Sequence, residues 1–392
     1  MSNADAIVSR HSLIMNKLLF SISPSFPFNI ALRPRQTVAG LLCLAGMVVA
    51  TQPCSAESGG NMVIARYSHT ATLLPDGRVL VAGGRRSTKV LKASELYDPA
   101  TNTWTATGNL RQERTIHVAC LLPDGRVLVA GGEDSRNFQL DSAEIYDPAS
   151  GRWTNTGRMN VPHAFCEMVL LSNGLVLMTG GIEGTSELYN PATGTWTVTG
   201  SMKHPRFDGR ATVLMDGKVL VAGGWSNGSP GFIARAEVYD PATGSWKDTG
   251  NLITARRLQT QTLLADGRVL IAGGVPQSGE YLSSAEIYDP STRIWTETGQ
   301  LNIGRTGATA NLLPDGNVIL VGGLNVTFVG LTSVEEYEPM QGTWEVSPLT
   351  LLHGRVAHTE TTLSNGSLIV AGGDDMLPGP LPQEADLFVR PE

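Results

Sequence analysis

The chain has 392 residues, of which 41% are hydrophobic and 17% charged, and it contains 44 glycines. This apolar content supplies a large core and excludes an intrinsically disordered chain, while glycines without a strict triplet period exclude collagen. The 29 Lys and Arg residues against 36 Asp and Glu residues give a net charge of -7, so we expect no nucleic-acid partner. No apolar run reaches the roughly 18 residues that a membrane-spanning helix needs.

The first 56 residues have the composition of a secretory leader. A 13-residue apolar run covers 38–50, Arg33 and Arg35 precede it, and the small residues at 54–56 follow it. A basic segment, a short apolar segment and a small-residue cleavage site in this order are typical of a signal peptide. We predict cleavage after Ala56; the alternatives are a buried strand or a retained anchor helix.

The leader also bears on where the chain starts and where it is delivered. The 37 residues before the apolar run are unusually many for a signal peptide, so Met15 is an alternative start. A cleaved signal would deliver the remaining chain to the periplasm, the cell surface or the medium. We therefore predict two parts, a leader over 1–56 and a folded domain over 57–392.

The predicted domain repeats one motif seven times. A Gly-Gly pair follows a short apolar run at intervals of 48, 49, 43, 50, 49 and 50 residues, and the 336 residues of 57–392 equal seven units of 48. A fixed period of this length is the signature of a repeat architecture. The pairs are Gly83-Gly84, Gly131-Gly132, Gly180-Gly181, Gly223-Gly224, Gly273-Gly274, Gly322-Gly323 and Gly372-Gly373.

The second repeat shows which elements each unit is expected to form. Two strands at 117–122 and 126–130 flank a Pro-Asp-Gly turn, and two more at 143–146 and 153–156 flank a second turn. Short runs rich in Val, Ile, Leu and Thr, bounded by Pro, Asp and Gly, are strand signals. Four short antiparallel strands cannot bury both faces of their sheet alone, so the units should stack into a closed ring.

Each unit but the last also carries a Tyr and, seven residues later, a Trp. Gly-Gly, Tyr and Trp once per roughly 50 residues resembles the kelch repeat of β-propellers. The resemblance implies an all-β, seven-bladed kelch-type propeller with four-stranded antiparallel blades. The Tyr-Trp pairs are Tyr97/Trp104, Tyr146/Trp153, Tyr189/Trp196, Tyr239/Trp246, Tyr288/Trp295 and Tyr337/Trp344.

The seventh unit departs from this pattern. Phe388 stands in the Tyr position, and the chain ends before a fourth strand. The family closes its ring when one terminus completes a blade begun at the other. Because Gly60-Asn61-Met62 before Arg66 parallels Gly108-Asn109-Leu110 before Arg114, we predict that the segment around 54–63 supplies the outer strand of the last blade.

Residue types that recur in every unit are expected to be scaffold. An Arg precedes the first strand in six units, and a carboxylate lies in the third strand of all seven. We expect these to form a repeated buried ion pair; the alternative is a ring of Arg at an anion-binding mouth, against which His163 interrupts the column. The members are Arg66, Arg114, Arg206, Arg256, Arg305 and Arg355, and Glu95, Glu144, Glu187, Glu237, Glu286, Glu335 and Asp386.

The loops after Gly-Gly differ in every unit, whereas the remaining turns are near copies of one another. Variable loops on a rigid scaffold are where binding is usually located. We expect an exposed contact surface there; ordinary loop packing is the alternative. The candidate binding residues on these loops are Phe138, Trp225, Phe232, Tyr281, Phe328, Met376 and Leu377.

A second constellation lies at the start of the innermost strand of four consecutive units. His358, His69, His117 and Cys166 occupy the position eight residues before each turn Gly. Imidazole and thiolate bind transition metals, so these are weak candidates for a metal site. The alternative is packing between blades. We predict neither a metal nor another cofactor, and two buried thiols at Cys120 and Cys166 rather than a disulfide.

The kelch-like family includes an oxidase acting on galactose, sialic acid mutarotases and many binding proteins. The oxidase's copper site needs two Tyr, two His and a Tyr–Cys crosslink, but only Tyr67 and Tyr281 lie outside the Tyr column, and neither has a His beside it. Mutarotation needs only an acid and a base. Side chains expected near the propeller axis could supply them: Arg210, Glu167, Asp208, Glu360 and His358.

We predict a secreted, monomeric propeller that binds a protein or carbohydrate through its variable loops, and we favour this over an enzyme. The alternative function is a sugar mutarotase-like isomerase at the mouth of the central channel. A binding module should present an apolar patch over Trp225, Phe232 and Phe328. An enzyme should bring polar groups together near the axis, from the set His69, His117, Glu167, Arg210 and Glu360.

Overall fold

The computed structural model describes residues 54–181, 183–227 and 231–389, and from Ser55 onward they form one compact unit. All regular secondary structure in these ranges is β-strand. They contain no helical segment with the length and apolar character needed to cross a bilayer. The predicted signal peptide, apart from its last three residues, lies outside the described residues, and its cleavage stays a prediction.

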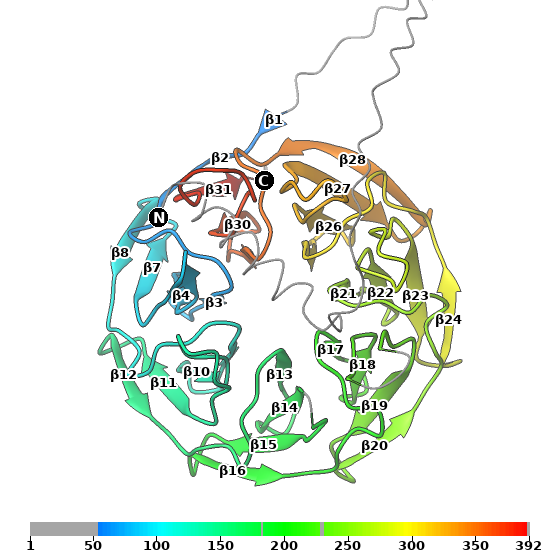
Figure 1. The fold of residues 1–392 in the computed structure, drawn as a ribbon, viewed down its shortest axis with the longest axis horizontal. Coiled ribbons are helices and arrows are strands. Elements are labelled where there is room, and N and C mark those ends of the chain that lie inside the picture. The colour runs from blue at the N-terminus through cyan, green and yellow to red at the C-terminus, as the bar shows by residue number, and fades with distance from the viewer. Residues whose placement is uncertain (1–53, 182, 228–230, 390–392) are drawn as a thin grey trace, which may run out of the picture. The chain divides into compact units, whose positions relative to one another are not determined.

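Seven four-stranded antiparallel blades are arranged around a common centre in the described residues (Figure 1). Blades one and two are β3 (Thr70–Leu73), β4 (Val79–Ala82), β7 (Ser94–Asp98), β8 (Thr103–Ala106), and β9 (Val118–Leu121), β10 (Val127–Ala130), β11 (Ala143–Asp147), β12 (Arg152–Asn155). Blades three and four are β13 (Cys166–Leu170), β14 (Val176–Gly180), β15 (Glu187–Asn190), β16 (Thr195–Val198), and β17 (Arg210–Val213), β18 (Val219–Ala222), β19 (Ala236–Asp240), β20 (Ser245–Asp248). Blades five and six are β21 (Thr260–Leu263), β22 (Val269–Ala272), β23 (Ala285–Asp289), β24 (Ile294–Glu297), and β25 (Thr309–Leu312), β26 (Val318–Val321), β27 (Ser333–Glu338), β28 (Thr343–Thr350).

Blade seven combines the two ends of the described chain. It contains β29 (Thr359–Thr362), β30 (Leu368–Ala371), β31 (Glu384–Phe388) and, at its outer edge, β2 (Glu57–Asn61). Of the three remaining short strands, β1 (Cys54–Ser55) is hydrogen-bonded to β28 at the edge of blade six, and β5 (Arg85–Arg86) pairs with β6 (Lys89–Val90).

The N-terminal strand closes the ring, as predicted. In β2, Glu57 pairs with Leu387 and Ser58 with Asp386 in antiparallel register. The indole Nε1 of Trp104 in blade one donates a 2.9 Å hydrogen bond to the carbonyl of Gly59, so β2 also joins the neighbouring blade. Phe388 lies opposite Leu368 and is buried, which is the Tyr position of the other blades.

The innermost strands complete the ring at the centre. β3, β9, β13, β17, β21, β25 and β29 each pack against the innermost strands of both neighbouring blades. The second strand of every blade is buried along its whole length, and the apolar core lies between adjacent blades. A single blade would leave these faces in water, so the ring is the unit that buries them.

The predicted Arg–carboxylate pairs form in six blades and are buried. Each pair lies within one blade, with nitrogen–oxygen distances from 2.5 to 2.9 Å. Blade three replaces the Arg with His163, whose Nε2 lies 3.4 Å from a carboxylate oxygen of Glu187. A buried charged side chain needs a partner of opposite charge, because removal of one member of the pair leaves the other charged, buried and without solvent.

The hydrogen bonds around these pairs show why the columns recur. In blade two, Arg114 donates to the carbonyls of Gly131 (2.8 Å) and Ser142 (3.1 Å). Glu144 accepts the backbone N–H groups of Arg111 (2.7 Å) and Gln112 (3.0 Å), in the segment that arrives from blade one. Each pair therefore anchors the link between two blades, and the columns are scaffold.

Candidate functional site

The predicted metal candidates are not brought together around a common point. His117 Nε2 hydrogen-bonds Thr70 Oγ1 of the preceding blade (3.1 Å), and His69 Nε2 does the same with Thr359 Oγ1 (2.9 Å). His358 Nε2 makes the third such hydrogen bond, with Thr309 Oγ1 (3.0 Å). We call these three blade interfaces (six–seven, seven–one and one–two) the regular seams, because one His–Thr contact joins the blades at each.

The histidines of the regular seams also explain the first Gly of the Gly-Gly pair in the preceding blade. A Cβ added to Gly83, whose φ is +62°, would lie 2.7 Å from Cε1 of His117, and one on Gly372 would lie 2.5 Å from Cε1 of His69. The imidazole therefore occupies the space that the missing side chain leaves. Burial lowers the pKa of His69 and His117 well below the usual range, so both rings are neutral.

The donor set for copper or another transition metal does not fit the described residues. Among them, no group of three or more His, Cys, Asp or Glu side chains is close enough to hold a metal ion. Cys120 and Cys166 are free thiols, and burial raises the pKa of Cys120 to about 11. Tyr67 donates its hydroxyl to the carbonyl of Ser87 (3.1 Å).

The seams of blades three to five depart from the His–Thr arrangement. At the seam between blades three and four, Gly209 occupies the His position, so no imidazole joins these two blades. Arg210, the next residue, donates from Nη1 to Glu167 Oε1 (2.9 Å) and from Nε to the carbonyl of Gln259 in blade five (3.2 Å). The side chain of Arg210 is 41% exposed and that of Glu167 25% exposed, so this pair is open to a ligand.

A second ion pair lies beside the first. Arg257 Nη1 is 3.4 Å from Asp208 Oδ2, and both side chains are more than nine-tenths buried. Asp208 interacts electrostatically with Arg210 and Glu167 as well as with Arg257. Glu167, Asp208, Arg210 and Arg257 therefore form one group with two positive and two negative members, which we call the charge cluster.

The two carboxylates of the charge cluster hold their protons more tightly than usual. Burial raises the pKa of Asp208 to about 6, against the opposing influence of Arg257 and Arg210. Burial also raises the pKa of Glu167, with Arg210 opposing it. Both groups can then exchange protons nearer to neutral pH than free carboxylic acids do.

Half-buried aromatic rings border the charge cluster on the variable-loop side. Ring centroids are 6.1 Å apart for Phe165 and Phe207 and 4.8 Å apart for Phe207 and Trp225. Trp225 forms an antiparallel backbone β-bridge with Phe232. The guanidinium carbon of Arg257 lies 5.6 Å from the ring centroid of Phe232. We call these four rings the aromatic shelf, and Arg257 connects the shelf to the charge cluster.

Two residues expected to be exposed on the variable loops are buried. Tyr281 is only 8% exposed and packs edge-on against Phe328 with centroids 6.2 Å apart, and Met376 is buried as well. These expectations were wrong because loop composition does not reveal which large side chain packs inward. Phe138, Phe328 and Leu377 are exposed as expected.

The structure places the remaining predicted residues apart from the charge cluster. Glu360 lies at the seam between blades six and seven and faces Thr309 and Asn311. Phe138 is on blade two, where the guanidinium of Arg136 lies 5.0 Å from its ring centroid. Of the predicted polar groups, the structure therefore brings together Glu167, Arg210 and Asp208, and it adds Arg257.

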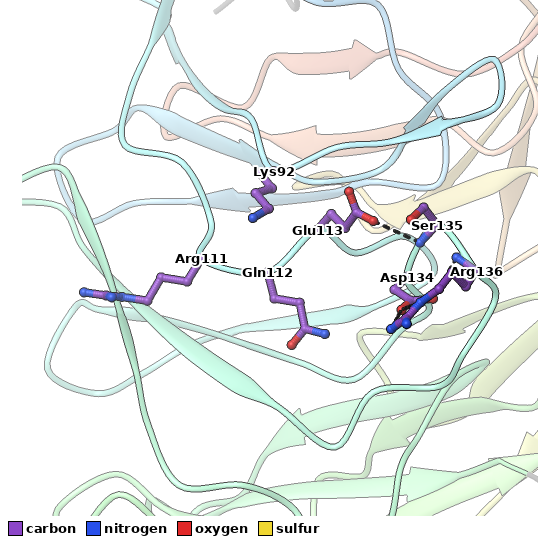
Figure 2. Close-up of a pocket in the computed structure, with 7 residues that line it drawn as sticks. All are labelled: Lys92, Arg111, Gln112, Glu113, Asp134, Ser135 and Arg136. Atoms are coloured by element: carbon purple, nitrogen blue, oxygen red, sulfur yellow. Dashed lines mark hydrogen bonds and ion pairs between the residues drawn. The ribbon is translucent and has the colours of Figure 1, made fainter.

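A separate polar cavity of about 380 Å³ opens between the loops of blades one and two (Figure 2). Its charged lining is largely self-paired: Arg136 binds Asp134 (2.9 Å), and Glu113 accepts the backbone N–H of Ser135 (3.2 Å). Figure 2 shows the guanidinium of Arg111 extending away from these carboxylates, and its Nε donates to the carbonyl of Trp153 (3.3 Å). No aromatic ring lines this cavity, so it is a weaker binding site than the charge cluster with its shelf.

Comparison with known proteins identifies the repeat. The Kelch motif matches residues 66–111, 114–160, 206–252 and 256–302, which correspond to four of the seven blades. No curated protein matches the chain in sequence.

Two solved structures illustrate the similarity in fold. One is a novel fungal alcohol oxidase with catalytic diversity among the AA5 family, in complex with copper; it is 18% identical with a TM-score of 0.68, over 85% of this chain and 76% of that one. The other is YjhT, 15% identical with a TM-score of 0.57, over 73% of this chain and 99% of that one. Sequence identities this low support a similarity of fold and no similarity of function. With the motif matches and the seven blades described above, they show that the chain is a seven-bladed β-propeller that contains kelch repeats.

Proposed function

We propose that this propeller is an interaction module and that its ligand-binding site is the charge cluster with the aromatic shelf, on blades three to five. The observation that carries the proposal is the location of both features at the seams that lack the His–Thr contact. Repeated residues build the frame of a propeller, so a local departure that places charges and rings side by side is best explained by a ligand.

The chemistry of the site favours a carbohydrate. The charge cluster has no net charge, and its guanidinium donors lie beside carboxylate acceptors, which suits a ligand with many hydroxyl groups. The aromatic shelf offers flat apolar faces against which the C–H faces of a sugar ring can stack. The net charge of -7 for the whole chain adds no attraction for an anionic ligand.

A glycan array probed with the full chain tests this proposal. We expect binding to at least one glycan, loss of that binding in Trp225→Ala and in Arg210→Ala, and retention in Phe138→Ala. Phe138 is the matched control because it is an aromatic residue of a variable loop with 61% exposure, on a blade outside the site. Binding that survives both site variants, or depends on Phe138, would contradict the location of the site.

Asp208 favours a second candidate function, acid–base catalysis on the bound sugar. A carboxyl group with a pKa of about 6 beside a guanidinium can both donate and accept a proton near neutral pH. Interconversion of sugar anomers needs only such exchange. Nuclear magnetic resonance of anomer exchange should then show acceleration by the wild-type chain and none by Asp208→Asn, and equal rates for the two would exclude catalysis by this group.

A further inference from the structure

The side chain of Glu360 carries a buried carboxyl group at the regular seam between blades six and seven. The proposed ligand site is on other blades, three to five. Glu360 lies on β29, the innermost strand of blade seven, opposite Val370 of β30. Both carboxylate oxygens are sealed from solvent, and neither makes a hydrogen bond of good geometry with a described residue. A buried carboxylate in this condition is costly unless it is neutral or paired.

The same position in the other blades shows that the seam accepts uncharged side chains. In blade five it is Gln261, whose Nε2 donates to Thr212 Oγ1 of the preceding blade (2.8 Å). In the remaining five blades the position holds an uncharged side chain, namely Ala71, Ala119, Met168, Ala211 and Ala310. Glu360 is therefore the exception in its column, and a neutral amide of the same shape already fits the equivalent site.

Within the described part of the chain, the groups around Glu360 do not supply a counter-charge. From β25 it faces the hydroxyl of Thr309 and the amide of Asn311. On its own strand, His358 hydrogen-bonds the same Thr309, and burial lowers the pKa of His358 to about 3, which keeps the ring neutral. On the side that faces β3 of blade one, His69 is also neutral. The nearby Arg355 is paired with Asp386 at 2.7 Å.

We propose that Glu360 makes the seam between blades six and seven pH-sensitive: the protonated carboxyl fits the dry seam, and its ionisation loosens the contact between β29 and β25. A protonated carboxyl can donate to Thr309 or Asn311, whereas the carboxylate must draw in water. Blade seven also holds the closing strand β2, so a looser seam weakens the ring where its two ends meet.

The direction of the effect follows from proton linkage. Burial raises the pKa of Glu360 from 4.5 to about 7 in the folded chain. Because the folded-state pKa is the higher one, the bound proton stabilises the fold fully below about pH 4.5, and this contribution is lost as the pH rises toward and through 7. The wild-type chain should therefore be less stable than a neutral variant at alkaline pH, and equal to it in acid.

Chemical unfolding of the full chain at pH 5 and pH 8 tests this. We expect Glu360→Gln, which copies Gln261, to have an unfolding constant within about fivefold of the wild-type value at pH 5 and roughly a hundredfold smaller than the wild-type value at pH 8. Glu297→Gln is the control, because Glu297 is an exposed carboxylate at the end of β24, and it should follow the wild type at both pH values. A ratio between Glu360→Gln and wild type that does not change with pH would overturn the proposal.

A direct titration keeps the proposal testable if Glu360→Gln does not fold. Carbon-13 nuclear magnetic resonance of the Glu360 carboxyl in the wild-type chain should give a midpoint near 7, and hydrogen exchange in β25 and β29 should quicken over the same range beyond the intrinsic effect of pH. A midpoint below 5 would overturn the proposal. A midpoint that falls when calcium chloride is added would overturn it too, since a cation would then occupy the seam in place of the proton.

Discussion

The regular seams and the seams of blades three to five solve the same packing problem differently. At the regular seams, a neutral His from one blade rests on the first Gly of the preceding blade and bonds its Thr. At the seam of blades three and four, Gly209 supplies no such ring, and a partly exposed Arg210–Glu167 pair joins the two blades. The first arrangement joins blades through neutral side chains, whereas the second leaves charges available at the inner edge of the ring.

The difference separates residues that maintain the ring from residues that are free to bind. Each buried Arg–carboxylate pair satisfies its own blade and the segment arriving from the preceding one. The charge cluster does not recur around the ring. Changes to the first group should therefore alter stability, and changes to the second should alter binding.

The largest effect should follow loss of the closing strand. Deleting residues 1–65 removes β2, exposes the edge of β31, and takes away the carbonyl that accepts Trp104 Nε1. We expect the melting temperature, followed by circular dichroism, to fall sharply or cooperative unfolding to disappear. An unchanged melting curve would show that the ring does not depend on β2.

Loss of one buried Arg–carboxylate pair should have the next largest effect on stability. Arg114→Ala leaves Glu144 buried without its counter-ion, and we expect the free energy of unfolding to fall by about 3–5 kcal/mol. Arg126→Ala is the matched control, because Arg126 pairs with Asp124 at the surface, where such pairs contribute less than about 1 kcal/mol. Urea denaturation of both variants gives the comparison, and similar losses would refute the scaffold role of the buried pair.

Arg210→Ala should weaken binding while leaving the ring intact. Loss of charge-assisted hydrogen bonds is worth about 1.5–3 kcal/mol, so a glycan bound by the wild type should bind roughly ten- to a hundredfold more weakly. Because Arg210 is partly exposed, its removal should shift the melting temperature little. Thr70→Val, at a regular seam, should leave the affinity unchanged in isothermal titration; an affinity loss there equal to that of Arg210→Ala would remove the distinction between the seams.

The smallest expected effect is the dependence of ligand affinity on pH. Asp208 has a pKa of about 6, so it is mostly protonated at pH 5 and mostly ionised at pH 7. If its carboxylate accepts a ligand hydroxyl, the affinity should rise by up to about tenfold between these values. Asp208→Asn should bind with little dependence on pH over this range. A wild-type affinity that falls as Asp208 ionises would mean that the protonated carboxyl is the binding form.

The fold was predictable because its signals are local and repeated. The Gly-Gly period gave the blade count, and the likeness of Gly60-Asn61-Met62 to Gly108-Asn109-Leu110 gave the closing strand. The buried ion pairs also followed from the sequence, since an Arg and a carboxylate recur at fixed positions in each unit. Each of these inferences needs only the geometry of one blade, repeated around the ring.

The candidate site was predictable only in part. Glu167, Arg210 and Asp208 could be identified because they depart from their columns, but Arg257 follows a scaffold Arg and carries no such signal. Its partner Asp208 is 49 residues away along the chain, and the contact forms only when two blades stand side by side. The position of the His residues was also identifiable, whereas their bonds to Thr side chains of the preceding blade required the seam geometry.

Fluorine nuclear magnetic resonance of the chain labelled with 5-fluorotryptophan tests the central claim most directly. The chain has seven Trp residues, of which six belong to the repeated column and the seventh is Trp225 on the aromatic shelf. Titration with a glycan found by the array should shift the resonance assigned through Trp225→Phe and leave the other six in place. Shifts in the column resonances with Trp225 unmoved would show that the ligand binds elsewhere and would contradict the assignment of the site to blades three to five.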